Sequence, residues 1–126
     1  MEKKVLHTDL APAAIGPYSQ AIEINGMIFA SGQIPINPAT GNLVEGGIQE
    51  QTRQALTNAS EVMKAAGVDM THVVKTTVFL ADMNDFVAMN EIYATFFTAP
   101  FPARSAVAVK ALPKGALVEV ECVAVK

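Results

Sequence analysis

The dipeptide Asn25-Gly26, set between two extended apolar runs at residues 19–24 and 27–31, constrains this fold more than any other local feature. Asparagine and glycine readily adopt the positive φ that a type I′ turn requires, and this turn matches the twist of two paired strands. The sequence therefore predicts a β-hairpin in the N-terminal third of the chain. A further short strand is compatible with the residues around Val5.

Hydrophobic periodicity places the remaining elements. Runs rich in β-branched residues predict strands, whereas apolar side chains that recur every three or four residues predict helices. Proline and glycine mark the loops and the helix ends. These criteria predict a surface loop at 35–47, helices over 48–66 and from 84 to the prolines at 100 and 102, and strands at 73–80, 103–109 and 118–125, the last two joined by a turn at 113–115. The predicted order is β-β-α-β-α-β-β, an α+β fold.

The length of 126 residues fits one domain, and we assign residues 1–126 to it. Two helices can cover only one face of the predicted sheet. The last strand nevertheless carries apolar side chains on both faces, and apolar residues make up 51% of the chain against 17% charged ones. We therefore expect the second face of the sheet to pack against other subunits.

Charge and metal-binding side chains exclude several classes of protein. The net charge of -3 argues against a nucleic-acid binder with a dense basic face. His7, His72 and Cys122 lie far apart in the sequence, so no metal site is expected, and the alternation of Cys122 with valines predicts a buried, inert thiol. The chain starts without the apolar segment of a signal peptide and has no run long enough to span a membrane. These features predict a cytoplasmic protein.

Arg104 is the most informative charged residue, because it opens an apolar strand. The other arginine, Arg53, lies on the polar stripe of the first helix and is expected to be solvated. A guanidinium in an apolar strand needs an anionic partner, and its fork suits a carboxylate. That partner is either internal, Glu119 or Glu121, or a ligand. The two glutamates share one face of the last strand, where a carboxylate also suits a general base.

Several other side chains are candidates for binding a polar ligand, although each has an ordinary structural role as well. Tyr18 follows a tight turn, and Ser31 with Gly32 closes the second strand, so all three also suit turn or capping positions. On the second helix Asn90 is a candidate, whereas Phe86 fits the core better. The sequence contains no nucleophile elbow, phosphate loop or cofactor motif. If the protein is an enzyme, the kind of site that these absences leave open is a hydrolytic one that activates a water molecule.

Six segments in a fixed order carry a resemblance to a known family. They are APAAIGPYSQA (11–21), SGQIP (31–35), QALTN (54–58), VKTTVFLADMNDF (74–86), FPARS (101–105) and VEVE (118–121). The match runs from about Pro12 to the C-terminus. On these motifs the chain resembles the Rid family, the reactive intermediate deaminases, in its RidA subgroup.

The resemblance implies a sheet like that of chorismate mutase with two helices on one face, assembled as a homotrimer with ligand clefts between subunits. It also implies a hydrolase. The expected substrates are 2-imino acids such as 2-iminobutanoate and 2-iminopropanoate, formed from enamines that pyridoxal-phosphate enzymes release. The products are 2-keto acids and ammonia, and the reaction needs no cofactor. The alternative is a keto-acid-binding regulatory or chaperone-like module without catalysis, which would not require Arg104.

The resemblance also assigns roles to individual residues. Arg104 matches the arginine that holds the substrate carboxylate, and Glu119 matches the glutamate that positions the attacking water. Tyr18 is expected to assist proton movement as ammonia leaves. The positions that match the lining of the cleft are Tyr18, Ser31, Gly32, Phe86, Asn90 and Ala106. Ala106 stands where many relatives carry cysteine, so only a main-chain contact is expected there.

Overall fold

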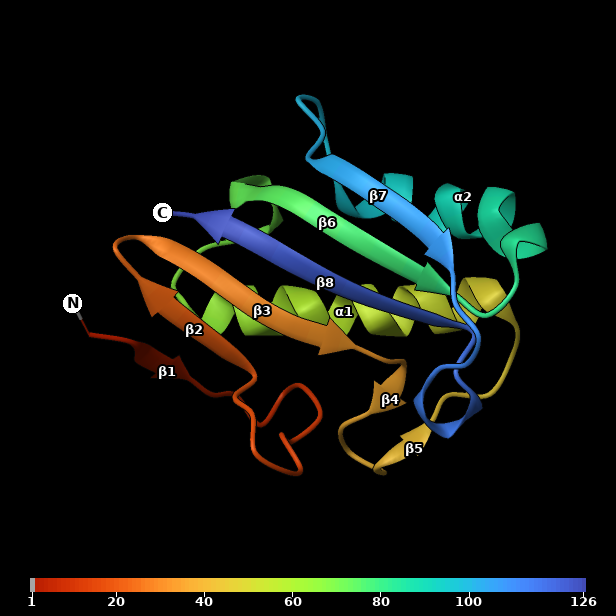
Figure 1. Cartoon of the computed structure of the whole chain (residues 1–126), viewed down its shortest axis with the longest axis horizontal. Coiled ribbons are helices and arrows are strands. Elements are labelled where there is room, and N and C mark those ends of the chain that lie inside the picture. The colour runs from red at the N-terminus through yellow and green to blue at the C-terminus, as the bar shows by residue number, and fades with distance from the viewer. Residues whose placement is uncertain (1) are drawn as a thin grey trace.

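A six-stranded mixed sheet with both helices on one of its faces forms the body of the protein (Figure 1). This computed structural model describes residues 2–126. The strands lie in the order β1-β2-β3-β8-β6-β7. The bounds of the elements are β1 Lys4–Leu6, β2 Ala21–Ile24, β3 Met27–Gln33, β6 Val73–Leu80, β7 Ala103–Ala108, β8 Val118–Val125, α1 Ile48–Ala65 and α2 Phe86–Phe96. The predicted α+β class and the order of its elements are confirmed.

The hairpin at Asn25-Gly26 forms as the sequence predicts. Asn25 has a φ of 51° and Gly26 a φ of 76°, the positive values of a type I′ turn. Ile24 therefore pairs directly with Met27, and the register continues along β2 and β3. The short strand β1, which includes Val5, adds to the free edge of β2.

The surface loop predicted at 35–47 contains structure that the sequence analysis missed. Two short strands, β4 (Ile36–Asn37) and β5 (Asn42–Leu43), form a separate small hairpin. Its turn is closed by Asn37, whose side-chain Oδ1 accepts from the Ala39 N–H at 2.9 Å and whose carbonyl accepts from the Gly41 N–H at 2.8 Å. Such side-chain-to-backbone bonds within a turn are typical of asparagine.

The last two strands are consecutive in the sequence but are not neighbours in the sheet. β6 lies between them, parallel to β7 and antiparallel to β8. The parallel pairing follows from the connection through α2, because a helical crossover returns the chain in the same direction. A short 3-10 turn, η2 (Met83–Asp85), precedes α2, so this helix begins at Phe86 and not at Asn84. The turn at 113–115 is the 3-10 turn η3 (Pro113–Gly115), which leads into β8 without forming a hairpin.

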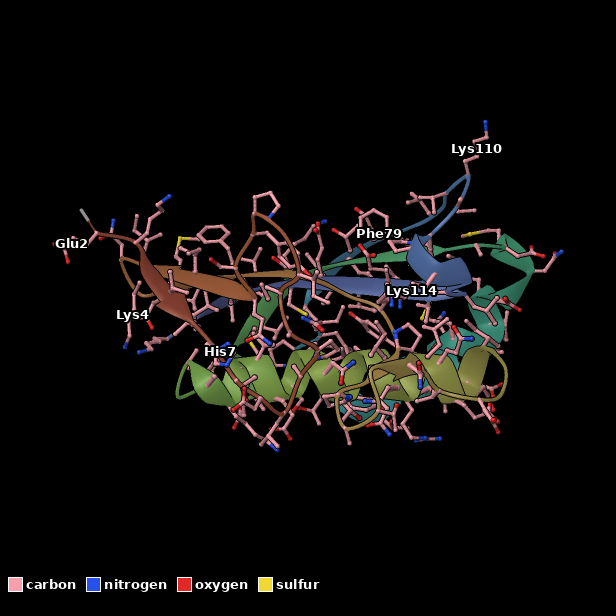
Figure 2. The ribbon with its side chains drawn as sticks, turned by 90° about the horizontal axis from the view of Figure 1, so that it is seen from below. Glu2, Lys4, His7, Phe79, Lys110 and Lys114 are labelled. Carbon is pink, nitrogen blue, oxygen red and sulfur yellow. The ribbon has the colours of Figure 1, made fainter. Side chains whose placement is uncertain are left out.

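The two faces of β8 have different surroundings. Val118, Val120, Cys122 and Ala124 are almost fully buried on the face that packs against the helices. Figure 2 shows α1 along this face and Phe79 on the opposite one. The opposite face, which we call the outer face, carries the remaining residues of β8. Four apolar side chains of the outer face are between 37% and 45% exposed: Met27, Phe29, Val107 and Val125.

Within residues 2–126, neither helix combines the length and the apolar character that a membrane crossing needs.

Candidate active site

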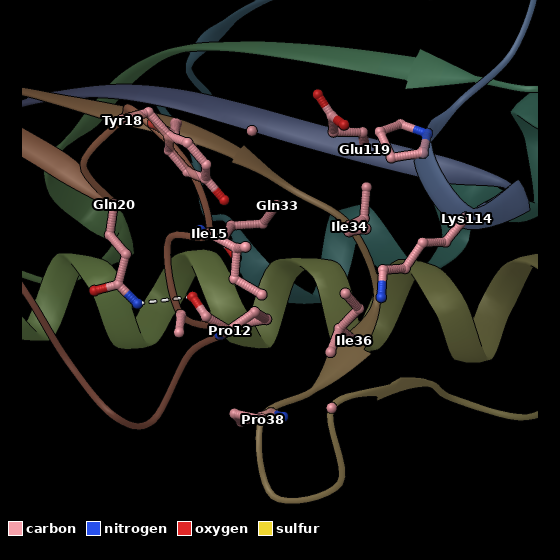
Figure 3. A pocket seen from close by; sticks show the side chains of 15 residues that line it. Pro12, Ile15, Tyr18, Gln20, Gln33, Ile34, Ile36, Pro38, Lys114 and Glu119 are labelled. Atoms are coloured by element: carbon pink, nitrogen blue, oxygen red, sulfur yellow. Dashed lines mark hydrogen bonds between the residues drawn. The ribbon is translucent and has the colours of Figure 1, made fainter.

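A pocket of about 730 Å³ is lined by predicted site residues from both the N-terminal and the C-terminal part of the chain. Tyr18, Ser31, Gly32 and Glu119 all line it. Figure 3 shows the Tyr18 hydroxyl and the Glu119 carboxylate on one side of this pocket, and Lys114 reaching in from η3. The rest of the lining is largely apolar and includes Pro12, Ile15, Ile34, Ile36 and Pro38. We call this the Glu119 pocket.

A bulge in β3 places Ser31 and Gly32 beside Glu119. The pairing of β3 with β8 shifts between Ala30 and Gln33, and the two residues between them form the irregularity. The Ser31 hydroxyl donates to the carbonyl of Ser19 at 2.6 Å, which holds the bulge against the preceding segment. An added Cβ at Gly32 would lie 2.8 Å from Cδ of Glu119. A side chain at this position would therefore displace the Glu119 carboxylate, which occupies that space in the presence of glycine.

The Glu119 carboxylate is a half-buried and unpaired acid. Among residues 2–126 it has no hydrogen bond and no ion pair. Burial raises its pKa above that of an ordinary glutamate, and the neighbouring carboxylate of Glu121 raises this pKa further. An unpaired carboxylate with a raised pKa accepts a proton more readily than a surface carboxylate does. Glu119 is thus suited to act as a general base.

The loop before β2 presents Tyr18 to the pocket. The loop is fixed by Gln20, a buried amide whose Nε2 donates to the carbonyl of Pro12 at 2.8 Å and to that of Thr8 at 3.0 Å. The Thr8 N–H in turn donates to Oε1 of Gln20 at 2.8 Å. Tyr18 itself is 53% exposed, and its hydroxyl has no partner within residues 2–126. Its phenol is therefore available to a ligand in the Glu119 pocket.

Arg104 occupies a second pocket, of about 530 Å³, between β7 and α2. Its Nη1 donates to Oδ1 of Asn90 at 2.6 Å. Its Cζ lies 4.7 Å from the ring centroid of Tyr93 and 5.4 Å from that of Phe86. Asn90 and Phe86 thus lie beside Arg104. Phe86 packs against the core, as its helical spacing predicts, and it lines neither of the two pockets. We call this second pocket the Arg104 pocket.

The structure rules out the internal salt bridge as an explanation for Arg104. Arg104 pairs with Thr76, a buried residue whose side chain is on the helix side of the sheet, whereas Glu119 pairs with Phe79 on the outer face. The two charged side chains therefore point to opposite faces of one sheet. No ion pair involves Arg104 within residues 2–126.

The other predicted residues lie as follows. Ala106 is on the Arg104 side of β7 and packs against the core, and it lines neither pocket. Cys122 is buried, and burial raises its pKa to about 12, so the thiol stays protonated as predicted for an inert core residue. Arg53 and His7 are exposed. His72 hydrogen-bonds to its neighbour Asp69 in the turn before β6. No group of three metal-ligating side chains occurs in the described chain.

Sequence reasoning missed Tyr93 and Thr76. The Tyr93 hydroxyl and Thr76 Oγ1 are 2.7 Å apart in the buried interior. Tyr93 was assigned to the apolar stripe of the second helix, where it does lie. Its spacing of three residues from Asn90 was the available signal, because residues three apart share a helix face.

The fold is shared with known proteins. The family model described as Endoribonuclease L-PSP matches residues 8–126. A protein of Mus musculus named 2-iminobutanoate/2-iminopropanoate deaminase is 55% identical over 124 residues, which cover 98% of this chain and 92% of the mouse protein. Among solved structures, YyfA from Yersinia pestis, described as a protein of unknown function of the conserved Rid protein family, is 55% identical with a TM-score of 0.96, over 99% of this chain and 100% of that one. E. coli TdcF with bound serine is 43% identical with a TM-score of 0.94, over 98% and 99% of the two chains.

These likenesses extend over nearly the whole chain. The chain therefore belongs to the Endoribonuclease L-PSP, or Rid, family, which confirms the resemblance drawn from its six motifs.

Proposed function

We propose that the protein is a hydrolytic deaminase that converts 2-imino acids, such as 2-iminobutanoate and 2-iminopropanoate, to 2-keto acids and ammonia. The observation that carries the proposal is the unpaired Glu119 carboxylate, whose pKa is raised by burial, in a pocket that also holds the Tyr18 phenol. The name of the mouse relative supports the same reaction. The net charge of -3 gives no support to RNA as a substrate.

Arg104 binds the substrate carboxylate in this proposal. Among the described residues 2–126 only Asn90 bonds to the guanidinium, at Nη1, so Nε and Nη2 are available to form two parallel hydrogen bonds to the substrate. This bidentate grip fixes the adjacent imine carbon in space. The serine bound to E. coli TdcF supports a ligand with a 2-amino-acid skeleton.

Glu119 activates the attacking water. The protonated imine carbon is electrophilic, and Glu119 takes a proton from the water as the new C–O bond forms. The resulting tetrahedral carbinolamine then breaks its C–N bond. The nitrogen gains the proton that Glu119 took from water, which Tyr18 helps to deliver, and leaves as ammonia. The hydroxyl oxygen becomes the carbonyl of the 2-keto acid as its proton passes back to the Glu119 carboxylate. One water is consumed, and no cofactor takes part.

The positions of the two pockets support a site that is shared between subunits. Because Arg104 and Glu119 point to opposite faces of one sheet, one chain does not bring them to the same substrate. We infer that the protein is a homotrimer in which the Arg104 pocket of one subunit meets the Glu119 pocket of the next. The exposed apolar residues of the outer face support such an assembly. We also place the protein in the cytoplasm, in keeping with its single free cysteine.

The central experiment measures imine loss. An amino-acid dehydratase generates 2-iminobutanoate in the assay, and semicarbazide traps the imine that remains. We expect the protein to lower the rate of trapping in proportion to its concentration. Trapping that is unchanged at any protein concentration contradicts the proposed reaction, and binding of 2-oxobutanoate without turnover would instead favour the keto-acid-binding module.

Mixing two inactive variants tests the shared site. Arg104→Ala retains a native Glu119 pocket, and Glu119→Gln retains a native Arg104 pocket. If each site combines residues of two neighbouring subunits, random mixed trimers regain native sites, and activity recovers to about a quarter of the normal level because one neighbour arrangement in four is productive. The imine assay on co-refolded variants measures this recovery.

Light scattering supplies the control for the mixing experiment. We expect a mass three times the 13.3 kDa of one chain for the parent protein and for both variants. A monomeric mass at micromolar concentration, or mixed trimers without any recovered activity, would contradict a site shared between subunits.

The raised pKa of Glu119 predicts a specific pH dependence. Glu119 works as a base only when ionised, so turnover falls as the pH drops through its raised pKa. In Glu121→Gln the neighbouring negative charge is lost, which stabilises the ionised form of Glu119 and lowers its pKa. The acid limb of the kcat profile should therefore move to lower pH in this variant. If the acid limb stays in place or moves to higher pH, the ionisation of Glu119 does not set the pH dependence of kcat.

A further inference from the structure

Tyr93 is a buried residue of α2 to which the proposed mechanism gives no role. It is only 6% exposed, and Cζ of Arg104 lies over its ring, 4.7 Å from the ring centroid. Its hydroxyl lies 2.7 Å from Oγ1 of Thr76, a fully buried residue of β6. The contacts of Tyr93 thus connect the sheet, the helix and the guanidinium.

We propose that Tyr93 is a positioning residue that orients the Arg104 guanidinium for the substrate carboxylate, and that Thr76 fixes the ring of Tyr93 in the required orientation. The inference rests on the proposed function, in which Arg104 binds that carboxylate. Tyr93 itself lines the Arg104 pocket, but the role proposed here for Tyr93 and Thr76 is exerted through the guanidinium.

The surroundings of Arg104 show how the orientation arises. An arginine side chain has four flexible bonds, and a bidentate grip requires its planar head in one orientation. The rings of Tyr93 and Phe86 attract the guanidinium through their faces, and Asn90 accepts from Nη1. Nε and Nη2 form the same edge of the guanidinium and have no partner within residues 2–126. These contacts therefore leave one bidentate edge free for a carboxylate.

The hydroxyl pair determines which way the Tyr93 ring faces. Thr76 lies opposite Arg104 on the neighbouring strand, so a bond from its side chain to Tyr93 fixes the ring beside the guanidinium. Phe97 packs on Tyr93 with ring centroids 4.6 Å apart. A tyrosine that served only the core would need the hydroxyl partner and the packing, but not an arginine over its ring.

Three variants test the positioning role by kinetics. In Tyr93→Leu we expect KM for the imine and Kd for 2-oxobutanoate to rise about tenfold, because a cation–ring contact in a partly desolvated site is lost. The kcat should stay within about threefold, since a carboxylate grip acts equally on substrate and transition state. Thr76→Val should raise KM about threefold by freeing the ring, and Thr76→Ser, which keeps a hydroxyl, should restore the parent value.

The matched control is Phe97→Leu. Phe97 belongs to the same aromatic cluster, since its ring packs on that of Tyr93. Arg104 lies over the rings of Tyr93 and Phe86 but not over that of Phe97, so this variant removes a ring without removing a ring contact of Arg104. A purely structural role for this cluster predicts the same lower stability and lower active fraction for both leucine variants, with KM unchanged in both. The positioning role predicts a raised KM in Tyr93→Leu alone. Circular dichroism and light scattering establish that each variant is folded and assembled.

An NMR measurement tests the contact without relying on activity. The chain has only two arginines, Arg53 and Arg104, so the two Nε–H signals are assigned by one substitution. Ring currents should set the Arg104 signal apart from that of exposed Arg53. We expect Tyr93→Leu to move the Arg104 signal toward that of Arg53, and Phe97→Leu to leave it in place.

The outcomes separate this inference from the proposed function. If the parent protein hydrolyses the imine but Tyr93→Leu leaves both KM and the Arg104 signal unchanged, the positioning role is overturned and the function stands. If the parent protein neither hydrolyses the imine nor binds 2-oxobutanoate, the proposed function fails, and orientation toward a carboxylate fails with it. A raised KM in Tyr93→Leu together with the moved Arg104 signal supports the inference.

Discussion

We expect Arg104→Ala to lose imine hydrolysis by at least about 100-fold while the protein stays folded and keeps its oligomeric mass. Two charge-assisted hydrogen bonds to the substrate carboxylate are together worth about 3–6 kcal/mol, which corresponds to a loss of this size or larger. The variant should keep its fold, because Arg104 is only half-buried and its side chain forms a single hydrogen bond within residues 2–126, to Asn90. The imine assay and circular dichroism measure the two effects.

The second arginine of the chain provides the control. Arg53 is exposed on α1, so Arg53→Ala should retain full activity with the same change in net charge. Arg104→Lys should also be poor, since an ammonium group cannot reproduce the planar fork. Near-normal turnover in Arg104→Ala would remove the proposed mechanism, and unfolding of this variant would assign Arg104 a structural role.

Glu119→Gln should have the second large effect. Glutamine keeps the shape of the side chain but cannot take a proton from water, and the loss of a general base costs about 100-fold or more in kcat. Binding of 2-oxobutanoate should survive, because the carboxylate grip by Arg104 is unchanged. Turnover measured by the imine assay and the Kd measured by calorimetry distinguish the two steps.

Glu121→Gln is the matched control for this variant. Glu121 lies two residues further along β8 on the same outer face, but it is exposed and does not line the Glu119 pocket. We expect its kcat at neutral pH to stay within about threefold of the parent, since only a neighbouring charge is removed. An inactive Glu121→Gln beside an active Glu119→Gln would transfer the catalytic role to Glu121.

Local sequence rules accounted for most of the individual elements. The hairpin turn at Asn25-Gly26, the helix that ends before Gly67 and the strand at 73–80 were predicted correctly, because turn chemistry, amphipathic periodicity and β-branched composition act over a few residues. The small hairpin of β4 and β5 was missed, since strands of two residues leave no periodic pattern. The six motifs identified the family and the candidate residues of both pockets.

The pairing of strands determined on which face of the sheet Arg104 lies, which the motifs did not show. Side chains alternate along a strand, so the sequence alone shows that Glu119 and Glu121 share one face of β8. It does not show whether Arg104 shares that face, because a shift of one residue in the pairing of β6 with β7 would turn Arg104 to the other side. The register of Arg104 with Thr76 places the guanidinium on the helix side, beside Asn90 and Tyr93.

The separation of the two pockets is therefore a result of tertiary structure. The sequence by itself determined the α+β class, the family and the chemical identity of the candidate groups, all of which depend on local patterns or on motif order. Only the folded chain assigned Arg104 and Glu119 to opposite faces of one sheet, and only packing brought Thr76 and Tyr93 to Arg104. The physical reason is that strand register and helix packing are set by contacts between residues far apart in the sequence, which no local pattern records.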